Sequence, residues 1–117
     1  MYRSLICAFL FIIASTANAI AIRPSKINLS MPGEYIIPVT LVESTGESAL
    51  AEIRIFKSLN QPVEEGILLD EIALRPNEHY FNPYELNFTK NGSYLLCAGY
   101  YKSRQYLRSC TQVQVGP

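Results

Sequence analysis

The sequence predicts an all-β protein, an antiparallel β-sandwich of about seven strands that forms one domain. Beyond residue 19 no stretch sustains a 3.6-residue apolar period, whereas several stretches alternate apolar and polar residues. Turn signals separate these stretches at short intervals, which is typical of an immunoglobulin-like or fibronectin-type sandwich. A chain of 117 residues has room for one such domain and no second one.

Residues 1–19 are predicted to be a cleaved secretory signal peptide. Arg3 supplies one positive charge, residues 5–14 are almost wholly apolar, and residues 17–19, Ala-Asn-Ala, match the small-residue pattern that signal peptidase requires. The apolar run is too short to span a bilayer core of about 30 Å. We therefore expect export to the periplasm or the extracellular space, with residues 20–117 as a domain without a membrane span.

Loss of the signal peptide changes the charge and the cysteine count. The whole chain has ten basic and ten acidic residues, so removing Arg3 leaves nine against ten, a net charge of −1. Nucleic acid and anionic membranes attract a basic excess, so we expect neither as the main partner. Only Cys97 and Cys110 remain after Cys7 is lost, and in an exported chain they are expected to form a disulfide.

The expected strands follow the alternating pattern along the chain, and Pro24 breaks the first of them. Pro38, in the second strand, lacks an N–H and favours an edge or a bulge over a central position. The strongest turn signal is Asn91-Gly92, because this pair accepts positive φ cheaply. The seven expected strands cover residues 20–29, 35–41, 49–55, 67–74, 80–88, 94–101 and 106–115.

The last hairpin has a register that its own residues support. A turn centred between Ser103 and Arg104 places Cys97 directly opposite Cys110, where cross-strand Cβ atoms lie about 4.5–5.5 Å apart. The expected disulfide therefore joins the last two strands within one sheet, instead of crossing the sandwich as in true immunoglobulin domains. The same register pairs Tyr101 with Tyr106 on the disulfide's face. On the other face it pairs Tyr94 with Val113 and Tyr100 with Leu107, as expected for a core.

Little in the sequence indicates catalysis, and we expect neither an enzyme nor a cofactor. His79 is the only histidine, and it follows a turn, so it is interpreted as solvated. Both remaining cysteines are assigned to the disulfide, and no ligand spacing for a metal is present. The acidic pairs at residues 64–65 and 70–71 lie in or beside a loop and are interpreted as solvated charges.

The tip of the last hairpin is the candidate contact surface. Its candidate binding residues are Tyr101, Arg104, Tyr106 and Arg108, on a chain whose remaining surface is acidic. Tyrosine and arginine are enriched at binding hot spots because they bury a large area at low entropic cost. The alternative interpretation is structural, with Tyr101 and Tyr106 forming only a cross-strand aromatic pair.

Three segments resemble the first domain of periplasmic pilus chaperones: residues 20–29 (IAIRPSKINL), 32–34 (PGE) and 51–56 (AEIRIF). In that family the first domain is immunoglobulin-like, and its exposed first and seventh strands complete or cap the sheet of a partner subunit. A basic residue on the first strand holds the partner's C-terminal carboxylate, and the resemblance implies this role for Lys26. The family has an arginine there, and the Cys97–Cys110 hairpin is foreign to its pattern.

These observations predict a non-enzymatic, exported domain that binds another protein. The function they favour is that of an assembly factor or chaperone that acts by strand pairing. The edges expected to pair are the first strand around Lys26 and the last hairpin around Tyr106. Two alternatives stay open. One is a structural or surface-exposed module, such as a minor fibre subunit, an adhesin or an effector, and the other is a small secreted inhibitor.

Overall fold

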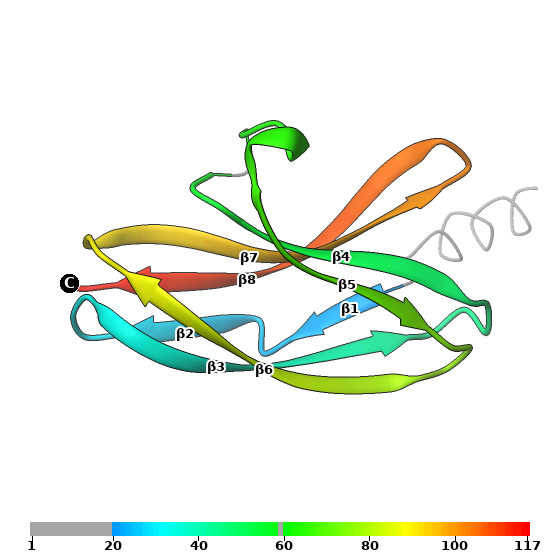
Figure 1. Cartoon of the computed structure of the whole chain (residues 1–117), viewed down its shortest axis with the longest axis horizontal. Helices are drawn as coiled ribbons and strands as arrows, with labels where there is room; N and C mark the ends of the chain where they lie inside the picture. The colour runs from blue at the N-terminus through cyan, green and yellow to red at the C-terminus, as the bar shows by residue number, and fades with distance from the viewer. Residues whose placement is uncertain (1–19, 59) are drawn as a thin grey trace, which may run out of the picture.

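The computed structural model describes residues 20–58 and 60–117 (Figure 1), so the expected signal peptide lies outside the described residues. The described chain is built of strands and one short 3-10 helix, which confirms the all-β prediction. In chain order the elements are β1 (Ile20–Arg23), β2 (Lys26–Leu29), β3 (Gly33–Glu43), β4 (Ala49–Phe56), η1 (Val63–Glu65), β5 (Ile67–Leu74), β6 (His79–Phe88), β7 (Gly92–Lys102) and β8 (Gln105–Val115).

The strands form two sheets that pack face to face. One sheet has the order β1-β3-β6 and the other the order β2-β8-β7-β4-β5. Neighbouring strands are antiparallel, except that β2 runs parallel to β8. The break expected at Pro24 is where the chain leaves the first sheet and joins the second (Figure 1). This change of sheet divides the expected first strand in two and gives eight strands instead of seven.

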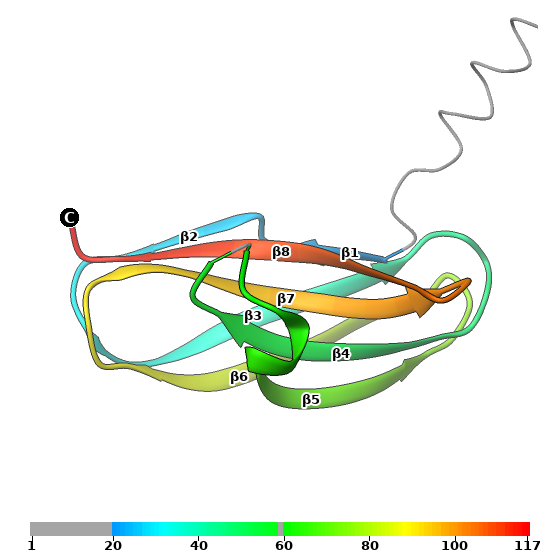
Figure 2. The same cartoon turned by 90° about the horizontal axis from the view of Figure 1, so that it is seen from above.

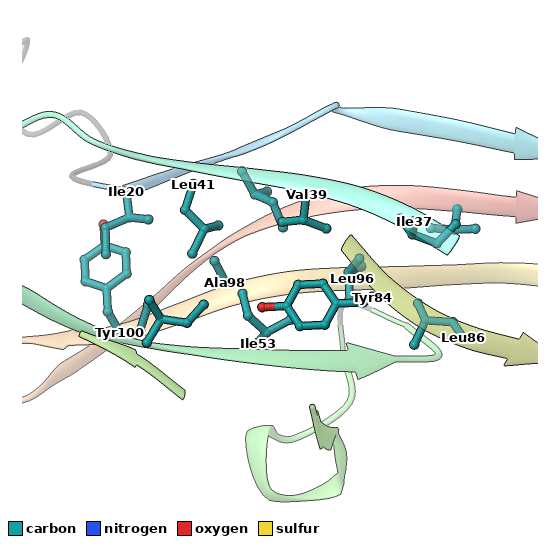
Figure 3. Close-up of a cluster of buried hydrophobic side chains, with 14 of the residues drawn as sticks. Ile20, Ile37, Val39, Leu41, Ile53, Tyr84, Leu86, Leu96, Ala98 and Tyr100 are labelled. Carbon is teal, nitrogen blue, oxygen red and sulfur yellow. The ribbon is translucent and has the colours of Figure 1, made fainter. Parts of the chain in front are cut away.

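The core lies between the two sheets and follows the period-two pattern of the sequence. Residues at alternate positions point inward, and Figure 3 shows side chains of β3, such as Val39 and Leu41, approaching Leu96 and Ala98 of β7 from the opposite sheet. The buried members of this core are Ile20, Ile22, Ile37, Val39, Leu41, Ala51, Ile53, Ile72, Leu74, Tyr84, Leu86, Phe88, Leu96, Ala98, Tyr100, Val113 and Val115.

Pro38 does not lie on an edge strand or at a bulge, as its missing N–H led us to expect. It lies on β3, the middle strand of its sheet, opposite Pro83 of β6. The neighbour on the other side, β1, pairs only with residues 40–43 of β3, so Pro38 stands beyond its end. A proline is tolerated here because one side has no ladder and the other side pairs it with a second proline.

Glu43, at the end of β3, joins two turns at one end of the sandwich. Its side chain is buried, and Oε1 accepts hydrogen bonds from the backbone N–H groups of Gly46 (3.0 Å) and Asn77 (2.8 Å). Oε2 accepts from the backbone N–H of Thr45 (2.8 Å) and from its hydroxyl. These donors, the Thr45 hydroxyl foremost, lower the pKa of Glu43 to about 2, although burial acts in the opposite direction.

The lowered pKa of Glu43 predicts a pH-dependent part of the stability. Because the folded pKa lies below the ordinary value of 4.5, the charged carboxylate stabilises the fold above that value. The contribution is lost as the pH falls toward 2. Glu43→Gln should therefore unfold at a lower temperature than the wild type at neutral pH, and the difference should shrink across this range.

Thermal unfolding at several pH values checks the role of Glu43. Glu47→Gln, at an exposed position in the same turn, is the matched control and should follow the wild type. A Glu43→Gln difference that stays constant down to pH 2 would show that the charge of the carboxylate does not matter.

Candidate functional site

The β7–β8 hairpin has the register that the sequence predicted. Cys97 is opposite Cys110 and Tyr101 is opposite Tyr106. Ser103 and Arg104 form the two-residue turn with φ of 51° and 68°, as hairpins with a right-handed twist require. The disulfide has an S–S distance of 2.02 Å and joins Cα atoms 4.0 Å apart. It ties two neighbouring strands within one sheet, which confirms that prediction.

The disulfide lies on the outer face of the five-stranded sheet, beside a pair of tyrosines. The rings of Tyr101 and Tyr106 meet edge to face with their centroids 5.0 Å apart. Tyr106 lies over Gly99, where a Cβ atom would stand only 1.7 Å from the Tyr106 hydroxyl oxygen. Tyr101 is 68% exposed, whereas the buried Tyr106 hydroxyl makes no hydrogen bond to any described residue, and burial raises its pKa.

Arg108 is held against the protein instead of reaching into solvent. Its guanidinium carbon lies 4.4 Å from the centre of the Phe56 ring, which is 1% exposed on the same outer face. Gly66, in the loop before β5, packs directly against this ring, where a Cβ atom would stand only 2.4 Å from a ring carbon. Arg54 fixes that loop by donating to the Gly66 carbonyl (3.0 Å) and to Glu52 (3.1 Å). Arg108 is therefore a packing residue as well as a candidate contact.

The structure brings together four of the five residues predicted to bind. Tyr101, Tyr106 and Arg108 share the outer face of the hairpin, and Arg104 stands at its tip. Figure 1 shows this hairpin curving away from β4 into solvent. Lys26 lies apart, on β2 opposite Gln112. It is about 20 Å from Tyr106 along the strand at roughly 3.3 Å per residue.

The last strand is an edge along only part of its length, which the sequence did not predict. β2 pairs with residues 112–115 of β8, and β1 belongs to the other sheet. Residues 105–111 therefore have β7 on one side and, within the described part of the chain, no paired strand on the other. We call this second side the open edge of β8. The one sequence signal for it is the break at Pro24.

The hydrogen bonds of β8 show which backbone groups point toward the open edge. The N–H of Gln112 donates away from β7, to the carbonyl of Ser25 (3.0 Å). Backbone groups alternate in direction along a strand, so the N–H of Tyr106 also points toward the open edge and that of Leu107 points toward β7. The side chain of Ser109 accepts a bond from the N–H of Ile22 (3.4 Å), which holds β1 against the inner side of β8.

The residues considered for catalysis lie apart on the surface. His79 is exposed as the first residue of β6, and residues 64–65 are exposed on η1. Residues 70–71 lie on the edge strand β5, within the strand expected over residues 67–74. Asp70 accepts a hydrogen bond from the hydroxyl of Tyr84 (2.9 Å), which links the two sheets. Burial, with a contribution from Asp70, raises the pKa of Tyr84 to about 12.

Two further findings concern the described residues, 20–58 and 60–117. They contain no group of three or more histidine, cysteine, aspartate or glutamate side chains arranged to hold a metal ion. They also include no helix with the length and apolar character needed to cross a membrane.

Comparison with known proteins relates the chain to other domains by shape alone. No family model matches it, and no curated protein matches it either. The sulfur carrier protein SoxY from Chlorobium limicola f thiosulfatophilum is 18% identical, with a TM-score of 0.49 over 86% of this chain and 82% of that one.

Two other solved structures are similar to the same degree. The CARDB domain of a Pyrococcus furiosus protein, solved in complex with di-metal ions, is 16% identical, with a TM-score of 0.48 over 83% of this chain and 85% of that one. The soluble domain of PmoD from Methylocystis sp. is 18% identical, with a TM-score of 0.44 over 83% of this chain and 89% of that one. None of these similarities carries an argument about function.

Proposed function

We propose that this chain is a non-enzymatic, exported protein-binding domain that takes up a strand of its partner at the open edge of β8. The observation that carries the proposal is the half-filled edge, where β2 covers residues 112–115 and leaves residues 105–111 without a strand. Unpaired N–H and C=O groups along an edge are a template for another strand. A partner strand would continue the line of β2.

The side chains around the open edge support a peptide partner. Tyr106 and the exposed Tyr101 offer aromatic surface on the outer face of the hairpin, beside the open edge, and Arg104 adds a positive charge at the tip. At the other end stands Lys26, whose exposed ammonium group suits a C-terminal carboxylate. This arrangement favours an assembly factor or chaperone over a catalytic role, in line with the resemblance to the pilus chaperones.

Export is part of the same proposal. Support comes from the Cys97–Cys110 disulfide, since disulfides persist in oxidising compartments, and from the signal-peptide pattern of residues 1–19. Mass spectrometry of the protein from its native host should give Ile20 as the first residue.

A proline at position 106 tests strand pairing most sharply. Tyr106→Pro removes an N–H that points toward the open edge and leaves the ladder with β7 intact, whereas Tyr106→Ala removes the same side chain but keeps the N–H. Strand pairing predicts at least about tenfold less partner capture for the proline variant than for the alanine variant. Val113 is not suitable for this test, because it is fully buried between β2 and β7.

The capture uses the tagged protein in extracts of the native host, with cross-linking and mass spectrometry. Both variants must first match the wild type in their circular-dichroism spectra and show cooperative unfolding. Equal capture by the folded proline and alanine variants would rule out strand pairing at this edge.

The exposure of Tyr101 favours one alternative, a surface module that binds through side chains at the hairpin tip. In that case Tyr101→Ala with Arg104→Ala should weaken capture, and Tyr106→Pro should weaken it no more than Tyr106→Ala does. The same pull-down therefore separates the two functions.

A further inference from the structure

We propose that the strand taken up at the open edge of β8 is β5 of a second copy of this chain, so that copies associate head to tail. The inference rests on the proposed function and names its partner. β5 is the opposite edge of the same five-stranded sheet. Figure 2 shows β8 and β5 along opposite sides of the molecule. One copy can therefore offer β5 while its own open edge receives another copy.

The two edges carry opposite charge. Residues 20–29 (β1 and β2) and 101–112 (the hairpin tip and β8 as far as its contact with β2) include no acidic residue, and residues 58–74, which hold β5 and the segment before it, include no basic residue. The basic residues of the first group are Arg23, Lys26, Lys102, Arg104 and Arg108, of which Arg108 is turned over the ring of Phe56 on β4, away from the open edge. The acidic residues of the second group are Glu64, Glu65, Asp70 and Glu71. Complementary charge of this kind steers association and selects the partner edge.

The two edges also match in length and in chemistry. β5 has eight residues, and the open edge covers residues 105–111. β5 contains no lysine or proline, the residues that commonly protect a free edge from pairing. It starts with Ile67 and Leu68, which are 63% and 44% exposed. β5 is therefore a free edge that begins with exposed apolar side chains and carries its two charged residues, Asp70 and Glu71, beside a shift in its register with β4.

The backbone groups of β5 are in phase with those of the open edge. The N–H of Glu71 donates to the carboxylate of its own neighbour Asp70 (2.9 Å), so it points away from β4. By alternation the N–H of Ala73 points the same way. An antiparallel pair with Ala73 opposite Tyr106 therefore joins outward groups of both strands and places Ile72 beside Leu107 on the inward face.

This antiparallel register has consequences at both ends of the pair. It brings the acidic residues 64–65 of one copy toward Lys26 of the next. At the hairpin tip it brings Arg75 toward Arg104, where the carboxylate of Glu78 already lies 3.8 Å from the Arg75 guanidinium. Since the two paired surfaces differ, the contact is heterologous, and every added copy leaves a free edge for another.

Two edge-blocked variants test the inference by sedimentation velocity over a dilution series. Ala73→Pro blocks β5 and spares its ladder with β4, and Tyr106→Pro blocks the open edge; Ala73→Ser and Tyr106→Ala are their controls. The wild type should form a concentration-dependent series of oligomers that high salt weakens. Each proline variant alone should stay monomeric, and their equimolar mixture should form a one-to-one complex and nothing larger.

Charge reversal gives a second test, which keeps the backbone N–H groups of both edges. The double variant Glu64→Lys/Glu65→Lys reverses the charge of the loop before β5. The double variant Arg23→Glu/Lys26→Glu reverses the charge beside the open edge. All four positions are exposed. Each double variant alone should associate at least tenfold more weakly than the wild type, and mixing the two should restore association.

A wild type that stays monomeric at every concentration would overturn the inference, as would association that Ala73→Pro leaves unchanged. If Ala73→Pro abolishes association and Tyr106→Pro does not change it, then β5 pairs with β5 of the other copy. That result would also overturn the inference. None of these outcomes decides the proposed function. The proposed function is decided by the pull-down from native-host extracts. It holds if Tyr106→Pro, and not Tyr106→Ala, fails to capture a protein other than this chain itself.

Discussion

Removal of the Cys97–Cys110 disulfide should lower the free energy of unfolding by about 3 kcal/mol, the value expected for a closed loop of this length. The two cysteines are 13 residues apart in sequence and pair two long strands that carry the candidate binding surface. Without the bond, the unfolded chain gains conformational freedom and the hairpin loses its covalent tie. The melting temperature should fall by roughly 12–24 °C.

Urea and thermal unfolding of the Cys97→Ala/Cys110→Ala variant measure this effect. Alanine is the appropriate replacement because Cys97 is 1% exposed, and a serine there would add a buried hydroxyl. The matched control is the wild type unfolded with and without a reducing agent. A loss below about 1 kcal/mol would mean that the strand ladder alone holds the hairpin.

Replacement of Phe56 by alanine should cost about 3–5 kcal/mol, a loss typical of a large aromatic side chain removed from a packed site. The site is unusual because the ring lies on the outer face of a sheet, between the Arg108 guanidinium and Gly66. Its removal leaves a cavity under the loop of residues 57–66 and takes away the surface on which Arg108 rests. We expect the variant to weaken partner binding as well, since Arg108 then loses its position.

Phe81→Ala is the matched control for Phe56→Ala, because it makes the same chemical change at a side chain that is 61% exposed. The control should change the free energy of unfolding by no more than about 0.5 kcal/mol. Denaturant unfolding of both variants gives the comparison. Equal losses at the two positions would contradict the account of Phe56 as a buried support for Arg108.

The sequence was sufficient for the features that depend on neighbouring residues. Period-two alternation predicted the strands, because one face of each strand must be apolar to pack on the other sheet. The positions of two cysteines and one turn predicted the register of the β7–β8 hairpin, since a two-residue turn fixes every cross-strand pair that follows.

The features that sequence reasoning missed depend on residues far apart in the chain. Which half of β8 stays open depends on where β2 pairs with it, more than 80 residues earlier in the sequence. The position of Arg108 depends on Phe56, against which Gly66 of the loop before β5 packs. Sheet order likewise decides that β5 is the other edge, because a strand's own pattern does not name its neighbours.

Residue-resolved amide hydrogen exchange of dilute, monomeric protein shows whether residues 105–111 of β8 present an unpaired edge. Fast exchange is expected at the N–H of Tyr106, which points toward the open edge, and slow exchange at the N–H of Leu107, which bonds to β7. The N–H of Gln112, which donates to Ser25, should also exchange slowly. Equal, strong protection at Tyr106 and Leu107 would show that the edge is already closed and cannot take up a partner strand.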